Sequence, residues 1–429
     1  MQTIVYPLAS LLYISPLFSL LDGLAVLGIF LLALALALIL TRPTIPPREA
    51  QFIGEIIWPV LGVAALPAAF MIFQLLPLPT VAHPAWQSTA SALGSPLPGS
   101  ISIDEGATLL VLCRYCAFWA GVLLSAVVCV NRARAGKIYV AALFATTAVA
   151  ALYILTNLGS SPANTSASFA SEQRSGDDVL LIACFGLILS VAFALMAYKN
   201  RAKGDSVLGR LIPTWAFGLA GAAVCAAALL RAWNGPTAVA ICVGLIALAL
   251  VALARRLGLL VGGVLAATAL IVSLVLLAHS AGRSNLDITL RFAPGTQTQF
   301  ETVQRIVQDE PAFGTGAGTF ASLLQLYRST EDRQSHDLRS PFVAVVGVEM
   351  GRGFLLITLG VLSIASALLF RAAIRRGRDW IYPAATASCL VTAIVLAFAA
   401  PTDGSPALLL MGATILGLGL AQSRSRTAQ

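Results

Sequence analysis

Charged residues are scarce in this chain of 429 residues: 11% are Asp, Glu, Lys or Arg, whereas 58% are hydrophobic. The mean hydropathy is +0.87 and apolar runs without charge are long, which is typical of polytopic membrane proteins. We find no stretch that reads as a separate soluble domain. Water-facing chemistry is therefore restricted to a few polar segments.

Histidine and paired cysteine are also scarce, with three histidines and seven cysteines. Every cysteine lies within a predicted membrane span, so the sequence indicates no disulfide framework outside. Cys113-x-x-Cys116 has the spacing of metal ligands, but no second such pair and no nearby histidine accompanies it. We interpret these cysteines as small apolar core residues and expect neither a metal nor another cofactor.

No charged region precedes the first apolar stretch, which predicts a membrane anchor rather than a cleaved signal peptide. At about 20 apolar residues per helix, the sequence predicts an all-α transmembrane bundle of about twelve spans. The first two are separated only by Asp22 and Gly23, so a re-entrant pair is an alternative for them. The predicted spans are 4–21, 23–40, 56–78, 106–130, 138–158, 179–198, 211–230, 236–254, 257–279, 342–370, 380–400 and 406–422.

Basic residues alternate between the connecting segments. One set of segments carries 17 Lys and Arg residues, and the alternate set carries eight. The positive-inside rule therefore predicts that both termini and the basic segments lie in the cytoplasm. The net charge of +8 is then a topogenic signal facing anionic membrane lipid, and it is not an indication of nucleic-acid binding.

The longest polar segment, residues 281–341, separates the first nine predicted spans (1–280) from the last three and a short tail (342–429). The orientation predicts that this loop is extracytoplasmic. Thr298 and Glu301 form a capping box for one amphipathic helix, and Thr319 is the expected N-cap of a second. The two helices would form either a lid lying on the membrane surface or a helical cap packed on the bundle.

The glycine-rich sequence at 314–319, GTGAGT, joins these two predicted helices. It follows no strand and lacks the Lys-Ser/Thr of a P-loop, so a nucleotide site is not indicated. Alternating glycines favour a tight turn with close backbone approach. The alternative is that amides at the start of the second helix contact a phosphate directly.

Three ionisable residues lie within predicted spans, where an isolated charge is costly. Glu349 and Arg352 are three residues apart, so a structural ion pair on one helix competes with a binding role. Arg114 has no acidic partner in its own span and is the intramembrane candidate for binding an anion. Outside the spans, Arg231 is explained either by snorkelling or by binding, and His336 beside Asp337 is a candidate base or a solvated side chain.

Three segments together resemble the superfamily of O-antigen ligases and O-antigen polymerases. Residues 311–320, PAFGTGAGTF, are similar to a P-x-x-G-x-G-x-G-x-F pattern, and residues 348–353, VEMGRG, resemble E-x-G-x-x-G at the start of the next span. Residues 74–119 carry QLLPLP, PLPGSISID and LCRYCAFW, which are similar to the N-terminal half of many members. The order of these segments carries the resemblance.

The resemblance implies a transferase that needs no metal and no nucleotide. Its expected partners are a glycan linked to undecaprenyl diphosphate, a glycan or lipid acceptor, membrane lipid and other polysaccharide-assembly proteins. The residues expected to hold the substrate are Arg114, Arg231, Arg291, Arg305 and Glu349. The candidate base is His336 with Asp337, which would deprotonate the acceptor hydroxyl.

The chain departs from the family pattern at several charged positions. Ser340-Pro341 stands where the family usually has a histidine, and Thr296 stands where it usually has an arginine. A membrane component of polysaccharide assembly that has lost catalysis is therefore the second hypothesis. A secondary transporter is the third, although the spans show no obvious repeat and few charges.

Overall fold

The computed structural model describes the chain in thirteen stretches. They are 5–18, 24–41, 47–96, 98–157, 170–201, 214–231, 235–257, 305–306, 313–327, 340–377, 379–398, 400 and 404–424. These residues form helices and turns and contain no strand, so the predicted all-α class is confirmed for the described part of the chain.

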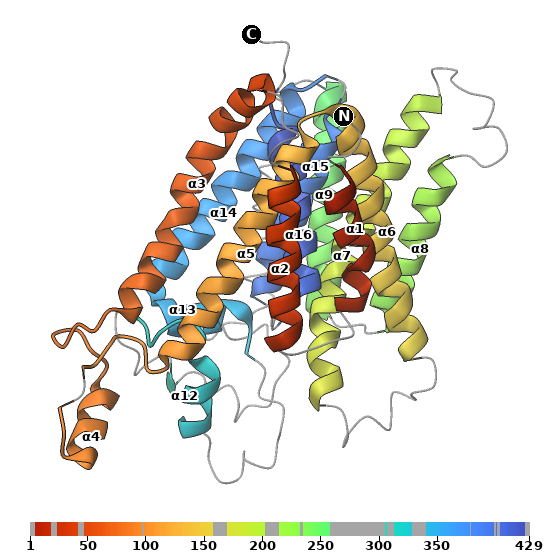
Figure 1. Ribbon diagram of the computed structural model, residues 1–429. Helices are drawn as coiled ribbons and strands as arrows, with labels where there is room; N and C mark the ends of the chain where they lie inside the picture. The colour runs from red at the N-terminus through yellow and green to blue at the C-terminus, as the bar shows by residue number, and fades with distance from the viewer. Residues whose placement is uncertain are drawn as a thin grey trace.

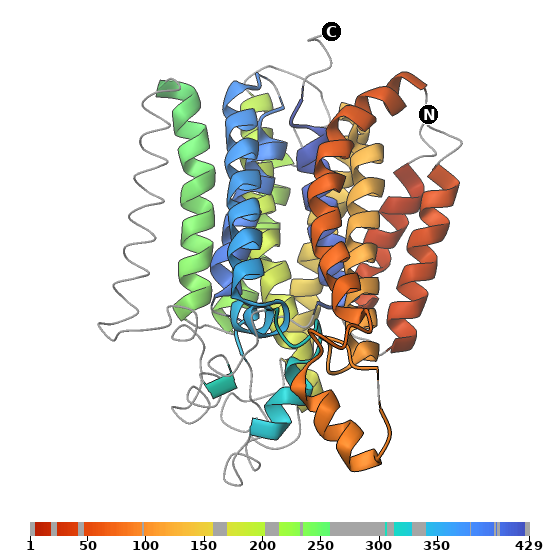
Figure 2. The same cartoon turned by 90° about the vertical axis from the view of Figure 1, so that its left-hand side faces the viewer.

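The long helices run side by side as a bundle (Figures 1 and 2). The helices of its first half are α1 (Tyr6–Phe18), α2 (Leu24–Thr41), α3 (Pro47–Leu75), α4 (Pro84–Leu93), α5 (Glu105–Cys129), α6 (Arg132–Thr156) and α7 (Ala170–Arg201). Those of its second half are α8 (Thr214–Arg231), α9 (Gly235–Leu257), α12 (Phe320–Tyr327), α13 (Phe342–Met350), α14 (Arg352–Arg375), α15 (Ile381–Ala397) and α16 (Pro406–Ala421).

Six helices of the described part are long and apolar enough to cross a membrane. The six candidate spans are Ile57–Leu75, Glu105–Cys129, Arg132–Thr156, Asp178–Ala197, Gly235–Arg255 and Arg352–Arg375. Five further apolar helices are shorter, among them α1 with 13 residues. Predicted span 257–279 lies outside the described residues from residue 258 onward. The structure thus supports a membrane protein, and the count of twelve stays a prediction.

Polar side chains define where several helices begin. The carboxylate of Asp104 accepts from the amide of Ala107 at 3.0 Å at the start of α5. Asn131 caps α6 in the same way, accepting from Ala133 at 2.9 Å. Each cap satisfies a first-turn amide that has no partner within its helix.

Helix α15 occupies the middle of the bundle and packs against α7, α9, α14 and α16. Close packing at its contact with α16 depends on Gly419, where a Cβ would meet the Oγ1 of Thr386 at 2.4 Å. Gly417 similarly brings α16 against α5, since a Cβ there would lie 2.5 Å from the carbonyl oxygen of Val122. Within a membrane the hydrophobic effect does not drive helices together, and small residues allow the close backbone packing that holds them together instead.

The flank formed by α3 and α14 is far less enclosed. Phe70 of α3 stacks on Phe354 of α14 with ring centroids 5.1 Å apart. Large apolar side chains on α14 point outward, with Leu356 70% exposed and Ile364 62% exposed. Such a face is expected of a helix in contact with lipid tails.

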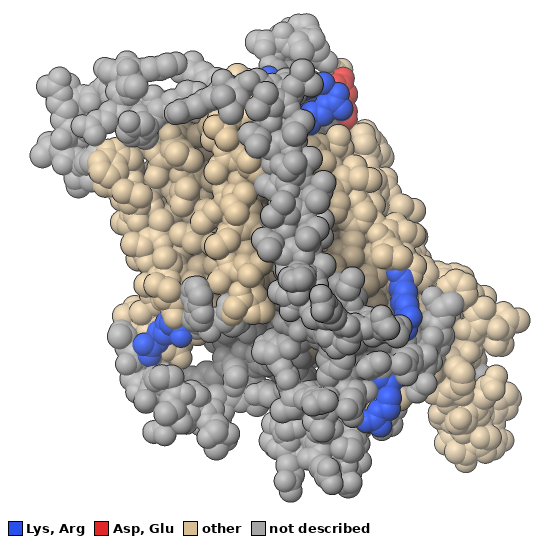
Figure 3. Space-filling view, turned by 180° about the vertical axis from the view of Figure 1, so that it is seen from behind, with Lys and Arg blue, Asp and Glu red and all other residues tan. Residues whose placement is uncertain are grey.

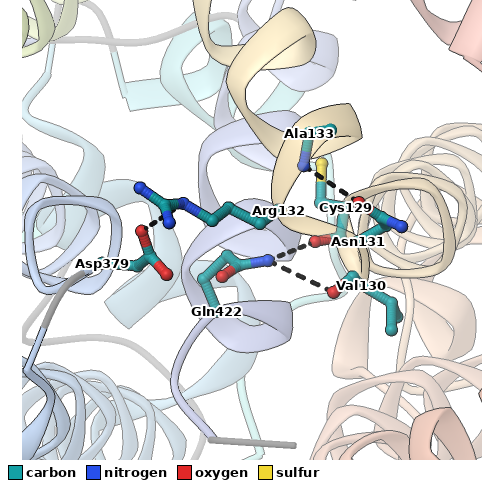
Figure 4. Close-up of polar contacts among 7 residues, drawn as sticks. All are labelled: Cys129, Val130, Asn131, Arg132, Ala133, Asp379 and Gln422. Carbon is teal, nitrogen blue, oxygen red and sulfur yellow. Dashed lines mark hydrogen bonds and ion pairs between the residues drawn. The ribbon is translucent and has the colours of Figure 1, made fainter. Parts of the chain in front are cut away.

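The two ends of the bundle differ in composition. Helices α4, α12 and α13 lie at one end, here called the loop end (Figure 1). The opposite end, here called the basic end, contains the α5–α6 and α14–α15 turns, joined by the ion pair of Arg132 with Asp379 at 2.8 Å. Gln422, just after α16, donates to the carbonyl of Cys129 at 2.6 Å at this end (Figure 4). Figure 3 shows Lys and Arg side chains toward the two ends, with a tan band between them.

Two details of the predicted spans are wrong. Residues 342–370 do not form one helix, because the chain breaks between α13 and α14 at Gly351, which has a φ of 85°. The interpretation of Cys113 and Cys116 as core residues is also wrong, since both are exposed on α5, as is Cys242 on α9. The remaining cysteines, which are Cys129, Cys184, Cys225 and Cys389, are buried as expected.

Candidate functional site

The glycine-rich segment Phe313–Thr319 forms a tight turn at the loop end, between α3, α5 and α13. Gly314, Gly316 and Gly318 have φ values of 72°, 108° and 82°, a backbone region that disfavours other L residues. A Cβ on Gly314 would lie 2.3 Å from the carbonyl oxygen of Glu349, and one on Gly316 would lie 2.4 Å from the Oγ of Ser102. The alternating glycines therefore serve close backbone contact, as the turn interpretation predicts.

Gln74, near the end of α3, fastens this turn to the bundle. Its Nε2 donates to the carbonyl oxygens of Phe313 at 3.1 Å and Glu349 at 2.9 Å. Its Oε1 accepts from the amide of Ala317 at 3.2 Å. The side chain is fully buried, so each of these bonds replaces one to water and leaving any unmade would be costly. We call the segment Phe313–Thr319 with its partners the glycine joint.

The residues before α5 and the first turn of α5 form the second wall of the glycine joint. The amide of Ile103 donates to the carbonyl of Thr315 at 3.0 Å, and the hydroxyl of Thr108 donates to the carbonyl of Ala317 at 2.8 Å. The hydroxyls of Ser102 and Thr108 lie 2.7 Å apart. Helix α4 is attached here as well, because the indole of Trp86 donates to the carbonyl of Ser102 at 3.0 Å.

The third wall is α13, which supplies Glu349. The amides of Thr315 and Gly316 donate to the carbonyls of Val348 and Glu349, each at 3.1 Å. The Glu349 carboxylate accepts from the amide of Phe320 at 3.2 Å and from that of Gly318. A carboxylate thus lies where α12 begins, at the end of the helix dipole that favours negative charge.

This arrangement changes the predicted cap of α12. Thr319 holds the expected position, since its carbonyl accepts from Leu323 at 3.1 Å. Its hydroxyl, however, bonds to the carbonyl of Gly316 at 2.7 Å and lies 2.9 Å from the hydroxyl of Thr315. The side chain that satisfies the first amides comes from Glu349 instead. An acid on another helix therefore occupies the place that a phosphate would take in the alternative interpretation.

Burial controls the ionisation of Glu349. The side chain is 8% exposed, and loss of hydration raises its pKa from the usual 4.5 to about 7, against the opposing effect of the two amides. Its helix α13 has 9 residues and is not among the candidate spans of the described part of the chain. A carboxyl with a pKa near neutrality changes charge within the physiological range.

Helix α12 packs on the bundle through the apolar face that its periodicity predicts. Phe320, Leu323 and Leu324 are buried and form one cluster with Ala344 and Val348 of α13. This contact favours the cap over the surface lid for the described helix. Most of the first predicted loop helix lies outside the described residues. Arg305 and Ile306 are helical, and the Ile306 side chain joins the same cluster.

The prediction that Glu349 and Arg352 form an ion pair on one helix is wrong in its geometry. The two residues lie on different helices, because Gly351 ends α13 and α14 begins at Arg352. The carboxylate of Glu349 turns to the amides of Gly318 and Phe320, and Arg352 is exposed. Among the described residues that the sequence predicts as site residues, Glu349 is the one that lies in the glycine joint.

The other predicted site residues have different surroundings. Arg114 is half-buried on α5, next to Tyr115, whose ring packs in the cluster beneath Ala317. Arg231 ends α8 and its Nη2 donates to the carbonyl of Asn157, which follows α6. Arg305 is exposed at the loop end. Arg291, His336 and Asp337 lie outside the described residues, so their roles stay predictions.

Residue-level reasoning missed Gln74, Ser102 and Thr108 as site residues. The signal available in the sequence was a glutamine inside predicted span 56–78, where a polar group needs a partner, and the structure shows that this side chain is fully buried. Within the part of the chain that the structure describes, no three His, Cys, Asp or Glu side chains group closely enough to hold a metal ion.

The glycine joint unites the three segments on which the sequence resemblance rests. Gln74 comes from segment 74–119, the turn from segment 311–320, and Glu349 from segment 348–353. Hydrogen bonds of 2.9–3.2 Å from the Gln74 side chain connect the three. No protein-family model matches the sequence, and no curated protein matches it.

Proposed function

We propose that this protein is a membrane glycosyltransferase of the O-antigen ligase type. It would transfer or polymerise a glycan carried on undecaprenyl diphosphate, at the outer face of the bacterial inner membrane. One observation supports the proposal most directly. Three segments far apart in the chain, each similar to a motif of that superfamily, meet in the glycine joint through the buried side chain of Gln74.

The finer topology belongs to the same proposal. The chain would have about twelve spans, both termini in the cytoplasm and the loop end outside. The basic turns of the described part, such as Arg132 to Lys137 and Arg371 to Arg376, occur at the basic end, as the positive-inside rule requires of cytoplasmic turns. The lipid-linked donor would then reach the loop end from within the bilayer.

The proposed chemistry divides among charged residues at the loop end. Arg231, Arg291 and Arg305 would bind the diphosphate or sugar, and Arg114 would make a deeper contact, because guanidinium groups suit phosphate oxygens. His336 with Asp337 would accept the proton of the acceptor hydroxyl. Glu349 would act through the fold of the glycine joint as well as through its charge, since its carboxylate is bonded to the start of α12.

Deletion of the gene tests this function when lipopolysaccharide and exopolysaccharide are analysed together. A ligase would leave lipid A-core without attached chains, and a polymerase would leave products with a single repeat. Restoration by a plasmid copy of the wild-type gene is the control. Normal glycan in the deletion strain, at the wild-type amount and length, contradicts the proposal.

A catalytically degenerate assembly component is the second candidate. It is favoured by the engagement of the Glu349 carboxylate with two backbone amides and by Ser340-Pro341 at the usual histidine position. This candidate predicts altered glycan quantity or chain length on deletion, together with full complementation by the His336→Ala variant. The enzyme predicts no complementation by that variant.

A further inference from the structure

A second polar site lies at the basic end, away from the glycine joint. Arg376 follows the last residue of α14, and its Nη1 atom is shielded from solvent without a hydrogen-bond partner among the described residues. Burial lowers the pKa of this guanidinium, while Asp379 raises it and Arg132 lowers it. A buried cationic donor without a partner is costly, so its retention calls for an anionic ligand.

Asp379, the acid that acts on Arg376, also interacts with Arg132. Asp379 bonds to the Nε of Arg132 at 2.8 Å (Figure 4) and is the only carboxylate that acts on Arg376 within the described residues. Two guanidinium groups therefore interact electrostatically with one carboxylate, and Tyr382 is the other ionisable group that acts on Arg376. The cluster carries an excess positive charge that one anionic group would balance.

A third arginine, Arg255, stabilises the backbone around this site. The Nη1 of Arg255, from α9, donates to the carbonyl of Ala373 at 2.9 Å, and its Nη2 donates to that of Gly377 at 2.7 Å. The same guanidinium lies 5.1 Å from the ring centroid of Trp380. These contacts fix the end of α14 and the turn in which Arg376 and Asp379 lie, so the Arg376 side chain is presented by an ordered backbone.

The position along the bundle identifies the source of the anion. Arg132 begins a candidate span of 25 residues, and Arg376 directly follows one of 24 residues. Helices of that length extend about 36–38 Å, whereas the hydrocarbon core of a bilayer is about 30 Å thick. Both arginines therefore reach the level at which the phosphates of phospholipids lie.

We propose that Arg376 and Arg132 bind a phosphate group between α6 and the α14–α15 turn. Guanidinium groups bind phosphate oxygens through paired charge-assisted bonds, and basic pockets between transmembrane helices bind anionic headgroups. A phospholipid headgroup and inorganic phosphate share this chemistry, and the span ends favour the lipid. The site lies at the opposite end from the glycine joint and does not depend on the proposed transferase activity.

Thermal unfolding of the full-length protein in a neutral detergent tests the site. We would titrate phosphatidylglycerol, phosphatidylcholine and inorganic phosphate separately and follow the midpoint of unfolding. Phosphatidylglycerol is expected to raise the midpoint of the wild type, whereas phosphatidylcholine at equal concentration raises it less. Arg376→Gln should weaken the apparent affinity about tenfold or more, because a hydrogen bond between charged groups is lost.

Arg375→Gln is the matched control, since it removes the same charge from an exposed neighbour on α14. The proposal requires this variant to keep the wild-type response, and Arg376→Lys to keep part of it. A shift with inorganic phosphate alone that Arg376→Gln abolishes assigns the site to soluble phosphate. Equal losses in the two glutamine variants overturn the proposal. If Arg376→Gln fails to fold, a wild type that responds no more to phosphatidylglycerol or inorganic phosphate than to phosphatidylcholine still overturns it.

Discussion

Gln74 and Glu349 are 275 residues apart in the sequence, and the Nε2 of the first donates to the backbone carbonyl of the second at 2.9 Å. The bond ties the end of α3 to the end of α13, directly before the chain breaks at Gly351. Through the turn at 313–319, the same glutamine also holds the start of α12. One side chain therefore bonds to both of the other segments of the glycine joint and helps to hold the elements of the loop end in their relative positions.

Replacing Gln74 by leucine should open the glycine joint. The change removes the Gln74 partner of the Phe313 carbonyl and of the Ala317 amide, and it leaves the Glu349 carbonyl with the Gly316 amide alone, at a cost of about 2–5 kcal/mol. Chymotrypsin should then cut faster after Phe320, and the fragment mass identifies the position. Gln87→Leu, an equivalent change on the exposed surface of α4, is the control and should leave the rate unchanged. Equal rates in the two variants would show that Gln74 does not hold the turn.

Gly316→Ala should have a comparable effect for a steric reason. The added Cβ meets the Oγ of Ser102 at 2.4 Å and its Cα at 2.7 Å, on a backbone with a φ of 108°. Strain of this kind costs about 1–3 kcal/mol, with overpacking in addition. Gly360→Ala on α14, where a Cβ would meet nothing within 4 Å, should be neutral or stabilising. The same proteolysis assay distinguishes them.

The glycine joint should lose stability as the pH rises. Burial raises the pKa of Glu349 from 4.5 to about 7, so the folded joint binds a proton that the unfolded chain has already released. The stabilisation is complete below about pH 4.5 and is lost as the pH rises through about 7. Hydrogen exchange measures it as the protection of the Ala317 amide, which should fall on the order of tenfold or more between pH 5 and pH 8.

Glu349→Gln is the control for this pH dependence. The amide oxygen still accepts from the start of α12, but the side chain no longer titrates. The ratio of wild-type to variant protection at each pH cancels the intrinsic exchange chemistry. A ratio that stays constant from pH 5 to pH 8 would assign the loss to another group.

His336→Ala should abolish transfer of glycan to its acceptor, because the candidate base is removed, while the amount of protein in the membrane stays constant. His279→Ala removes the same side chain at a position outside the motif segments and should leave transfer unchanged. Glycan profiles and membrane immunoblots give the two measurements. Normal glycan in the His336→Ala strain would remove this histidine from the mechanism.

The predicted sidedness can be measured with single cysteines in a cysteine-free protein. Ser91→Cys on α4 and Lys137→Cys on α6 are both exposed and lie at opposite ends of the bundle. A membrane-impermeant maleimide should label the first in intact spheroplasts and the second only after permeabilisation. The reverse pattern would place the loop end in the cytoplasm.

The helical elements could be predicted from the sequence because their signals are local. The period of Phe320, Leu323 and Leu324 identified the buried face of α12, and charge-free runs identified the long helices. The outward placement of Cys113 and Cys116 could not be read in the same way. Their helix is apolar on every side, so its pattern does not say which face meets lipid.

The site was harder to predict because its bonds are not local. The partners of Gln74 lie 239–275 residues away, and no periodicity relates positions so distant. The break at Gly351 has a glycine and the nearby charges of Glu349 and Arg352 as its signal, but apolar runs lie on both sides of this short segment, and a continuous span satisfied the same pattern. The cap of α12 was expected from Thr319, whereas the chain provides it from another helix.

The long separation within the glycine joint also sets an order of events during synthesis. Gln74 leaves the ribosome 243 residues before Ala317, an interval of roughly 12–50 s at typical bacterial and eukaryotic elongation rates. Throughout that time the buried amide group at the end of α3 has none of its final partners. The nascent chain must shield or hydrate it until the last third is translated, so a stalled or truncated product carries an open polar surface that quality-control proteases can recognise.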